Sequence, residues 1–493
     1  MRPVVQWDLP VRLDRDGGPP LQQQLVAAVR AAVLDGRLAA GVRLPATRAT
    51  ARQLGVARAT VLAAYEQLGG EGYLRSRAGS GTFVEPALRL PVPGPTRDPA
   101  PAPPRGGDGP ARPPVAVAAG APAPRDLTPG RPDTSRLLDP TWRRVWREAV
   151  ADVTRSGATE PPPLGRADLR AEVADHLGAA RGLAVDAADV VVTAGTVDGL
   201  ALALHVLGIP GGRGTGGRVV VEDPGYPRAR RCLHRLGCTP VPVDVDEHGL
   251  RVEDLPAEGV AAVLVTPSHQ YPLGAVLPLE RRTALLRWAR RTGAVVLEDD
   301  YDGEFRYGAA PLPALAGLDR ERTIHLGTFS KTLSPQLRAG YLVLPPGLRA
   351  EAAQVRHDLG EPVSAEQQRA LAAYLASGAL RRHVARARRD HGHRRTHLRR
   401  RLAGHPRIGL LPSDAGLHAV LALPAGSDVP AVLAEVRRRG YLLADLDDYT
   451  VAGVGRHGPA VVLGYGDAGL GELDGVVRAL EAALLATGCV VDN

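Results

Sequence analysis

The arrangement of apolar and polar positions divides the chain into three regions. In residues 1–85, apolar residues recur at helical spacing in three short stretches, each followed within a few residues by glycine. Two short strand-like runs around glycines then follow, from Gly72 to Val84. Three helices and a β-hairpin make up a winged helix-turn-helix domain, whose last helix enters the major groove of DNA. Helices are predicted at Leu21–Ala32, Thr47–Leu54 and Arg58–Leu68.

The second and third regions differ sharply in composition. Residues 86–125 are nearly all Pro, Ala, Gly and Arg, which bury too little apolar surface to fold, so we predict an extended linker. In residues 126–493, apolar strand-like runs alternate with amphipathic helical stretches, which is typical of an α/β domain with a mostly parallel sheet covered on both faces. Strands are predicted at Val190–Thr193, Arg218–Val221, Ala261–Thr266, Ala294–Leu297, Thr323–Leu326 and Gly340–Leu344.

Charge in the first region favours an anionic partner. Between Arg37 and Arg77 there are seven arginines against Glu66 and Glu71, a local charge of +5. Five of the seven fall at the start of the third helix, on one face of the second helix and beside the wing, which are the positions that approach DNA. The alternative is a solvated arginine surface in an arginine-rich protein. The predicted DNA-binding residues are Arg48, Arg52, Arg58, Thr60, Arg75 and Arg77.

Composition places the chain in a broad class. Its 493 residues are 44% hydrophobic, and neither a run of about 18 apolar residues nor a signal-like N-terminus is present. We therefore expect a protein of the cytoplasm that does not enter a membrane. Cys232, Cys238 and Cys489 have neither metal-ligand spacing nor the even number of a disulfide framework.

One lysine, Lys331, stands among 61 lysines and arginines. A guanidinium stays protonated, whereas a desolvated lysine amine can lose its proton, act as a nucleophile and form an imine. Lys331 follows a predicted strand, in Gly327-Thr-Phe-Ser-Lys-Thr332. We therefore predict that it condenses with the aldehyde of pyridoxal 5'-phosphate (PLP).

Two more elements of a PLP site follow predicted strands. Glu298-Asp-Asp-Tyr301 supplies a carboxylate, Asp299, to hold the pyridine nitrogen protonated, and a hydroxyl, Tyr301, for the ring hydroxyl. The alternative for this segment is a solvated acidic turn. Thr193-Ala-Gly-Thr-Val197 reads as strand, glycine turn and helix, and the free N–H groups of such a helix start attract phosphate. The predicted phosphate ligands are Gly195, Thr196, Val197, Thr328, Ser330 and Arg338.

A strongly basic stretch lies between Arg381 and Arg401, with ten arginines, one acidic residue and four histidines. Because no cysteine and only one carboxylate accompany the histidines, we expect no metal. An exposed basic helix is the favoured interpretation, and an accessory surface for DNA is the alternative.

The first region resembles the GntR superfamily of regulators. The resemblance covers about 65 residues, with Ala57 where the family usually has serine before the arginine. It rests on Leu44-Pro-Ala-Thr-Arg48, Leu54-Gly-Val-Ala-Arg58-Ala-Thr-Val61, Ala64-Tyr-Glu-Gln-Leu68, Glu71-Gly-Tyr-Leu74 and Gly79-Ser-Gly-Thr-Phe-Val84.

The third region resembles fold-type-I aminotransferases, and its fusion to a GntR-like domain resembles the MocR regulators. Glu222-Asp-Pro-Gly-Tyr-Pro-Arg228 matches the segment whose tyrosine stacks on the cofactor ring, which implies that role for Tyr226 and an effector-carboxylate role for Arg228. The resemblance also implies a small C-terminal α+β subdomain and a head-to-tail homodimer. Two positions depart from working aminotransferases. Tyr271 replaces the usual asparagine before Pro272, and the segment before Leu463 lacks the usual carboxylate-binding arginine, the nearest being Arg456.

Two functions follow from these patterns. The first is a regulator that binds operator DNA as a dimer, carries PLP on Lys331 and responds when an amine or amino acid exchanges with the lysine imine. The second is a working PLP-dependent aminotransferase with an accessory DNA-binding domain. The two departures from the enzymes, together with a well-formed winged helix, favour the regulator.

Overall fold

The computed structural model describes residues 11, 13–15, 19–34, 37–77, 81–85, 123–135, 137, 139–156, 160–210, 217–307, 312–451 and 457–488. The proposed linker, residues 86–125, lies outside this part except for its last three residues. None of the helices in the described ranges combines the length and apolar composition that a bilayer crossing requires.

The N-terminal domain has the predicted winged-helix plan. Its helices pack apolar faces together because residues such as Leu25, Val61 and Leu68 recur at helical spacing and are fully buried. The wing strands pair antiparallel, Leu74 opposite Val84. The elements are α1 (Leu21–Leu34), α2 (Thr47–Leu54), α3 (Arg58–Gly70), β1 (Leu74–Arg77) and β2 (Gly81–Val84).

The large domain is built on an eight-stranded sheet of order β4-β11-β10-β9-β8-β5-β6-β7. The run from β10 to β6 is parallel, whereas β11 and β7 run antiparallel to their neighbours. The predicted mostly parallel sheet is thus confirmed. Its strands are β4 (Val190–Thr193), β5 (Arg218–Asp223), β6 (Thr239–Asp246), β7 (Gly249–Leu250), β8 (Ala262–Val265), β9 (Val295–Asp300), β10 (Thr323–Thr328) and β11 (Gly340–Val343).

Helices cover both faces of this sheet because alternate strand residues are apolar in both directions. On β5, Val219 and Val221 pack with α6, α7 and α9, while Val220 packs with α8 on the other face. A third cluster joins β4 to α4, α5 and α10. These helices are α4 (Pro140–Ser156), α5 (Ala167–Arg181), α6 (Thr196–Val206), α7 (Pro227–Arg235), α8 (Leu279–Thr292), α9 (Arg349–Leu359) and α10 (Ala365–Ala376).

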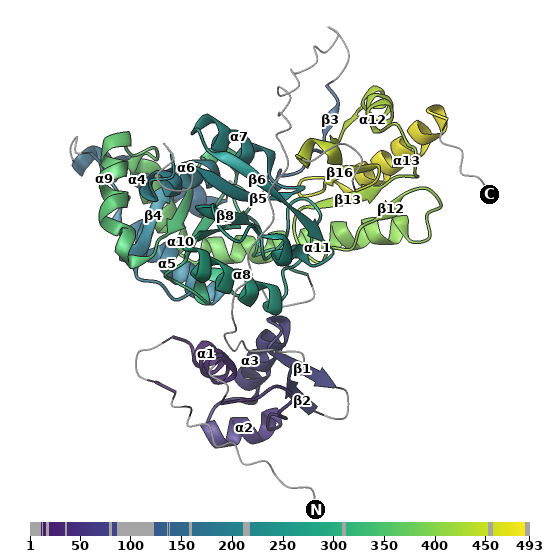
Figure 1. Cartoon of the computed structure of the whole chain (residues 1–493). Helices are drawn as coiled ribbons and strands as arrows, with labels where there is room; N and C mark the ends of the chain where they lie inside the picture. Colours follow the sequence, from purple (N-terminus) through teal and green to yellow (C-terminus); the bar gives the residue numbers. More distant parts are fainter. Residues whose placement is uncertain are drawn as a thin grey trace, which may run out of the picture.

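A C-terminal α+β subdomain, yellow-green to yellow in Figure 1, follows the long helix α11 (Ala379–Leu402). Its four-stranded sheet has the order β12-β13-β16-β15, with α12 and α13 packed together. The first strand after the linker, β3 (Arg125–Asp126), pairs with β14 (Tyr441–Leu442) here. The other elements are β12 (Gly409–Leu410), β13 (His418–Ala422), α12 (Val429–Arg438), β15 (Ala444–Asp445), β16 (Ala460–Gly464) and α13 (Leu470–Ala486).

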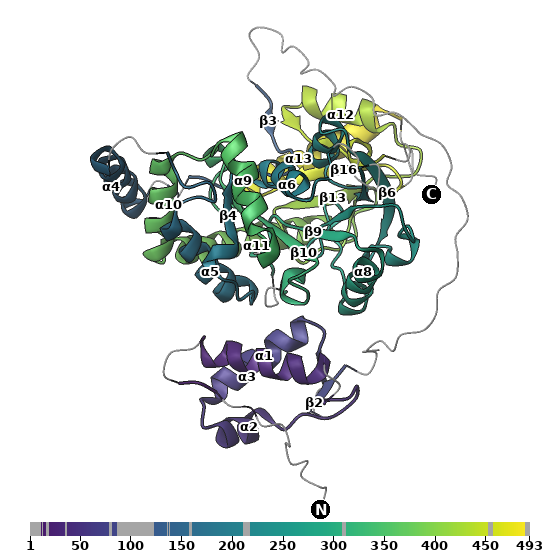
Figure 2. The same ribbon diagram turned by 60° about the vertical axis from the view of Figure 1, so that its left-hand side comes forward.

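The winged-helix domain, purple in Figures 1 and 2, lies against the large domain beside α8. Leu279, the first residue of α8, packs on the winged-helix core, and its Cβ lies close to Gly72 in the turn after α3. That turn is held by Glu71, whose buried carboxylate pairs with Arg30 at 2.9 Å. The contact therefore joins a rigid point of the DNA-binding domain to the start of a large-domain helix.

Candidate functional site

One cavity of about 400 Å³ opens where the parallel strands end. In an open α/β sheet, the loops after the carboxyl ends of the strands form the usual binding crevice. Here the loops after β4, β5, β8, β9 and β10 all reach the cavity, so residues far apart in the chain meet. Its lining includes every predicted cofactor and effector residue: Gly195, Thr196, Val197, Tyr226, Arg228, Asp299, Tyr301, Thr328, Ser330, Lys331 and Arg338.

Lys331 lies in the wall of this cavity, directly after β10. Burial lowers the pKa of its ammonium group, and the nearby Arg228 guanidinium lowers it further, while Asp302 and Asp299 raise it. Its Nζ donates a hydrogen bond to the backbone oxygen of Gly130 at 3.0 Å. The single lysine of the chain is therefore placed where the neutral, nucleophilic form of its amine is favoured.

Asp299 supplies an acceptor with an open position. Burial raises its pKa from 3.8 to about 7, and the neighbouring Asp300 carboxylate acts in the same direction. Within the described part of the chain, its buried Oδ1 has no hydrogen-bond partner. A buried, unsatisfied carboxylate oxygen in a cavity wall calls for a donor from a ligand, ideally a cationic one. A protonated pyridine nitrogen meets this requirement.

The amino end of α6 lines the same cavity as Asp299. Gly195 caps the helix with φ 95°, and no side chain occupies the free backbone N–H groups. A Cβ at Gly195 would lie 3.9 Å from Thr328 Oγ1 and 4.0 Å from Ser330 Oγ, so these hydroxyls face the same space. Helix N–H groups, two hydroxyls and the Arg338 guanidinium at the rim suit a phosphate.

Three tyrosines, Tyr226, Tyr271 and Tyr301, also line the cavity, and two polar residues stand behind Tyr301. Tyr271, between Tyr226 and Tyr301, meets both edge to face at 5.8 and 5.5 Å. The Tyr301 hydroxyl lies 2.9 Å from Nδ1 of His269, which pairs with Asp302 at 3.0 Å. Tyr301 is therefore oriented by a polar network, and Tyr271 offers an aromatic face at the position where working aminotransferases have an amide.

The second departure from the enzymes also has a structural counterpart. Strand β16 is entirely apolar and buried, so it presents no cation to the cavity. Arg456 lies outside the described residues. A cation that sequence reasoning missed, Arg131, does line the cavity, but it pairs with Asp126 at 2.8 Å and approaches Asp467 at 3.7 Å.

The loop Thr128–Arg131 is the part of the site that the sequence did not reveal. It follows β3, whose pairing with the C-terminal subdomain carries the chain to the cavity. Gly130 has φ 101°, and a Cβ there would lie 2.6 Å from the Lys331 amine. His269 was missed as well, because a lone histidine after a strand is no signal until the fold places it beside Tyr301.

Three of the six predicted DNA-binding residues lie around one hollow of the winged helix. Arg48, Arg52 and Arg58 border a single open hollow between α2 and α3. Ala57 caps α3 without a side-chain hydrogen bond, so the first N–H groups of this helix stay open to a phosphate. Thr60 lies in the same first turn, and Arg75 is exposed on the wing, whereas the Arg77 side chain lies outside the described part.

Two of the four histidines on α11, His383 and His391, are buried, and burial lowers the pKa of both imidazoles. Among the described residues, the one group of three possible metal ligands is His269, Asp302 and His418. Both nitrogens of His269 are engaged by protein groups, Asp302 on one side and Ser413 on the other.

Comparison with known proteins decides the family. Residues 21–84 match the bacterial regulatory proteins of the gntR family, and residues 127–452 match aminotransferase class I and II. The HTH-type pyridoxine biosynthesis transcriptional regulator PdxR of Corynebacterium glutamicum is 41% identical over 462 residues, 93% of this chain and 95% of that one. The chain belongs to the MocR-type transcription regulators.

Other MocR-type relatives and a solved enzyme extend this picture. The probable rhizopine catabolism regulatory protein MocR of Rhizobium meliloti is 36% identical over 394 residues, 78% of this chain and 77% of that one. An archaeal alanine:glyoxylate aminotransferase superposes with a TM-score of 0.64 and 25% identity, over 74% of this chain and 91% of the enzyme. This MocR-type regulator therefore carries an aminotransferase fold behind a GntR domain, as the sequence patterns predicted.

Proposed function

We propose that this regulator binds PLP on Lys331 and that chemical changes at this lysine control its affinity for operator DNA. The observation that carries the proposal is the cavity itself. Three groups line a single space: the one lysine of the chain, a buried Asp299 oxygen that has no hydrogen-bond partner among the described residues, and the amino end of α6. These are the three contacts that a pyridoxal phosphate needs: an amine, a partner for the ring nitrogen and a phosphate cup.

Each residue has a defined part in holding the cofactor. Bound PLP supplies an aldehyde that condenses with the lysine amine and a ring that draws electrons from the bound carbon. Asp299 would hold the proton of the ring nitrogen, Tyr226 would cover the ring face and Tyr301 would face the ring hydroxyl. The phosphate would be held by the N–H groups of Gly195–Val197 together with Thr328, Ser330 and Arg338.

There are two alternatives for the ligand that the protein senses. In the first alternative, an incoming amine or amino acid displaces the lysine amine, and Arg228 binds its carboxylate. In the second, PLP itself is the signal, so the protein reads the supply of the vitamin. The apolar strand β16, which offers no second cation for an amino acid carboxylate, favours the second alternative. The pyridoxine biosynthesis regulator among the relatives points the same way.

The contact between the domains offers a route for the signal. Arg282 of α8 donates hydrogen bonds to the backbone oxygens of Pro267 and Leu277, at 2.7 and 2.8 Å. Pro267 begins the loop that leads to Tyr271 in the cavity wall, and Leu279 on the same helix touches the winged-helix domain. A shift of this loop would therefore displace α8 relative to Gly72 of the winged-helix domain. Helix α8 is then the element through which cofactor binding and DNA binding would influence each other.

Operator binding follows from the winged-helix surface. Arg58 and Thr60 would reach the major groove, and Arg48, Arg52 and Arg75 the phosphates beside it. In a cytoplasmic homodimer, two such domains would read half-sites on the same face of the DNA. The alternative, a working aminotransferase, would require turnover at a site that has Tyr271 in place of the usual asparagine and no arginine on β16.

The deciding experiment combines three measurements on the purified full-length protein. Absorbance between 320 and 450 nm follows PLP binding, and borohydride reduction followed by peptide mapping finds the modified lysine. Mobility shift of the promoter fragment is then measured with the PLP-free protein, with PLP, and with PLP plus a panel of amines and amino acids.

The outcomes separate the alternatives. A change in operator affinity with PLP alone supports the vitamin as the signal, and a change that appears only with an added amine supports exchange at Lys331. Amino transfer between common amino and keto acids at about 1 s⁻¹ or faster would favour the enzyme instead. A colourless protein without a reducible adduct would refute the whole proposal.

A further inference from the structure

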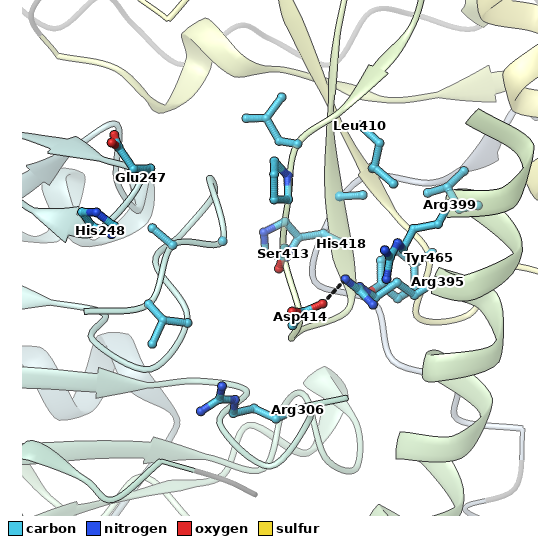
Figure 3. A pocket seen from close by; sticks show the side chains of 17 residues that line it. Glu247, His248, Arg306, Arg395, Arg399, Leu410, Ser413, Asp414, His418 and Tyr465 are labelled. Carbon is cyan, nitrogen blue, oxygen red and sulfur yellow. Dashed lines mark hydrogen bonds and ion pairs between the residues drawn. The ribbon is translucent and has the colours of Figure 1, made fainter. Parts of the chain in front are cut away.

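A second cavity, of about 540 Å³, lies between the large domain and the C-terminal subdomain. It shares no lining residue with the Lys331 cavity. Figure 3 shows its walls, with Glu247 and His248 on the large-domain side, and Arg395 and Arg399 along α11 on the other. Arg306 extends into the space between them. A cavity walled by two parts of the fold is a place where a ligand can bind both at once.

Arg306 lines this cavity and has buried hydrogen-bond donors that no protein acceptor satisfies in the described part of the chain. Its Nε and Nη1 atoms are buried, and among the described residues neither has a hydrogen-bond partner. Burial lowers the pKa of this guanidinium and the cationic Arg181 lowers it further, while the Asp414 carboxylate acts in the opposite direction. Burying the donors of a permanent cation without an acceptor is unfavourable, so such groups in proteins usually face an anion.

The other charges in the cavity leave this position open. Arg395 is already held by the carboxylate of Asp414, and it lies over the Tyr307 ring at 5.8 Å. The lining then holds three arginines, Arg306, Arg395 and the exposed Arg399, against two carboxylates, Glu247 and Asp414, of which Asp414 also acts on Arg306. The cavity therefore keeps an excess positive charge beside an unsatisfied guanidinium, which suits an oxyanion.

Hydrogen bonds connect this cavity to the first one. Ser413 lines the second cavity, and its Oγ lies 3.1 Å from Nε2 of His269. The opposite ring nitrogen of His269, Nδ1, lies 2.9 Å from the hydroxyl of Tyr301, which lines the Lys331 cavity. His418 packs against the His269 ring at 5.1 Å and lines the second cavity too. A chain of three polar side chains, the partly buried Ser413 and the buried His269 and Tyr301, thus connects the two cavities.

We propose that the second cavity is a binding site for a small molecule that carries a carboxylate or a phosphate, bound by Arg306 and Arg399. Its occupant also alters the environment of the cofactor ring hydroxyl through Ser413, His269 and Tyr301. The first statement stands on this cavity alone. The second rests on the proposed binding of PLP at Lys331.

The test titrates the PLP-loaded full-length protein with inorganic phosphate and, separately, with acetate, and follows the heat of binding. PLP fills the phosphate cup of the first cavity, and sodium chloride at matched ionic strength removes general salt effects. We expect saturable binding at one site per chain by at least one of the two anions. Arg306→Gln is expected to weaken it at least tenfold, and Arg399→Gln severalfold.

Arg400→Gln is the matched control, because Arg400 is the next residue on α11, is exposed and does not line the cavity. It should bind as the wild type does. Ser413→Ala should keep the anion affinity but lose the anion-induced change in the absorbance of bound PLP. The preference between phosphate and acetate then identifies the chemical class of the natural ligand.

Two results would overturn the site: no saturable binding of either anion, or an Arg306→Gln affinity equal to that of the wild type. If Arg306→Gln does not fold, Arg399→Gln decides, and an unchanged affinity there rejects the proposal. A protein that bound no PLP would still show the Arg306-dependent heat. Loss of anion binding in the second cavity and loss of PLP binding at Lys331 are therefore distinguishable results.

Discussion

Replacing Asp299 by asparagine should stabilise the protein without PLP and weaken its hold on PLP. The pKa of Asp299 is raised from 3.8 to about 7 by burial, so the ionised carboxylate is held against its own preference. Because a tenfold change in an acid constant is worth about 1.4 kcal/mol, the ionised form costs the fold about 4 kcal/mol. The side-chain amide of an Asp299→Asn variant carries no charge, so the variant is freed from this cost.

The pH dependence follows from the direction of this change. A carboxyl whose pKa is raised in the folded state takes stability away as pH rises from its unfolded pKa to its folded pKa. The PLP-free wild type therefore loses stability between pH 3.8 and about pH 7 on account of Asp299. The advantage of Asp299→Asn should be at most about 4 kcal/mol at pH 8 and about 2 kcal/mol at pH 5.

PLP binding should change in the opposite direction. A protonated ring nitrogen would donate a charge-assisted hydrogen bond to the buried carboxylate, worth about 1.5–3 kcal/mol. An amide cannot neutralise that cation. Asp299→Asn should therefore raise the Kd for PLP roughly 10- to 100-fold. One substitution thus separates what the carboxylate does for the fold from what it does for the cofactor.

The assay is urea denaturation of PLP-free protein at pH 5 and pH 8, followed by tryptophan fluorescence. Three of the four tryptophans, Trp142, Trp146 and Trp288, lie in the large domain, so the signal reports its unfolding. PLP affinity comes from absorbance titration. Asp300→Asn is the matched control. Asp300 is the next residue along and holds the buried Arg181 by two hydrogen bonds, so losing its charge should destabilise the fold by about 3 kcal/mol.

A destabilised Asp299→Asn variant, like the Asp300→Asn variant, would contradict these expectations. A loss of stability at pH 8 would mean that Asp299 already has a favourable partner in the protein. An unchanged Kd for PLP would mean that the carboxylate does not meet the ring nitrogen.

Three further changes test the other parts of the picture. Lys331→Arg should abolish the visible PLP absorbance with an unchanged near-ultraviolet dichroism spectrum, because a guanidinium does not condense with an aldehyde; persistence of the band would mean that another group carries the cofactor. Arg58→Ala should weaken operator binding by about 1–3 kcal/mol in a mobility shift and leave PLP affinity unchanged, and Arg287→Ala, an exposed arginine on α8, should change neither. Glu71→Gln should destabilise the winged helix by about 3 kcal/mol in thermal unfolding, because it leaves the Arg30 guanidinium, 13% exposed, without its counter-charge; a melting temperature equal to the wild type would contradict the ion pair.

The fold was readable where apolar residues are regularly spaced. The predicted strand Val190–Thr193 and helix Thr47–Leu54 have the bounds found in the structure, and the other predicted strands overlap their counterparts. Strand β6 was missed because Pro240 and Pro242 interrupt its pattern. Both prolines occupy alternate positions opposite β5, so their missing N–H groups fall on one side of the strand, and the ladder survives.

The site was readable wherever its residues follow a strand directly. Gly195 and Lys331 follow β4 and β10 within three residues, and Asp299 is the next-to-last residue of β9, so the mostly parallel sheet brings them to one edge. The loop around Gly130 has no local pattern of that kind. Its position depends on β3 pairing with β14, more than 300 residues later in the chain, which no local spacing encodes.

The Lys331 Nζ atom donates a hydrogen bond to the Gly130 carbonyl, and it is also the atom proposed to react with the aldehyde of PLP. Gly130 lies four residues after β3, near the point where the polypeptide coming from the DNA reader enters the large domain. When Nζ becomes covalently bonded to a carbon of another molecule, it has fewer hydrogens left to donate to this carbonyl. A reaction of the amine would therefore weaken a contact between Lys331 and the segment by which the chain enters the large domain.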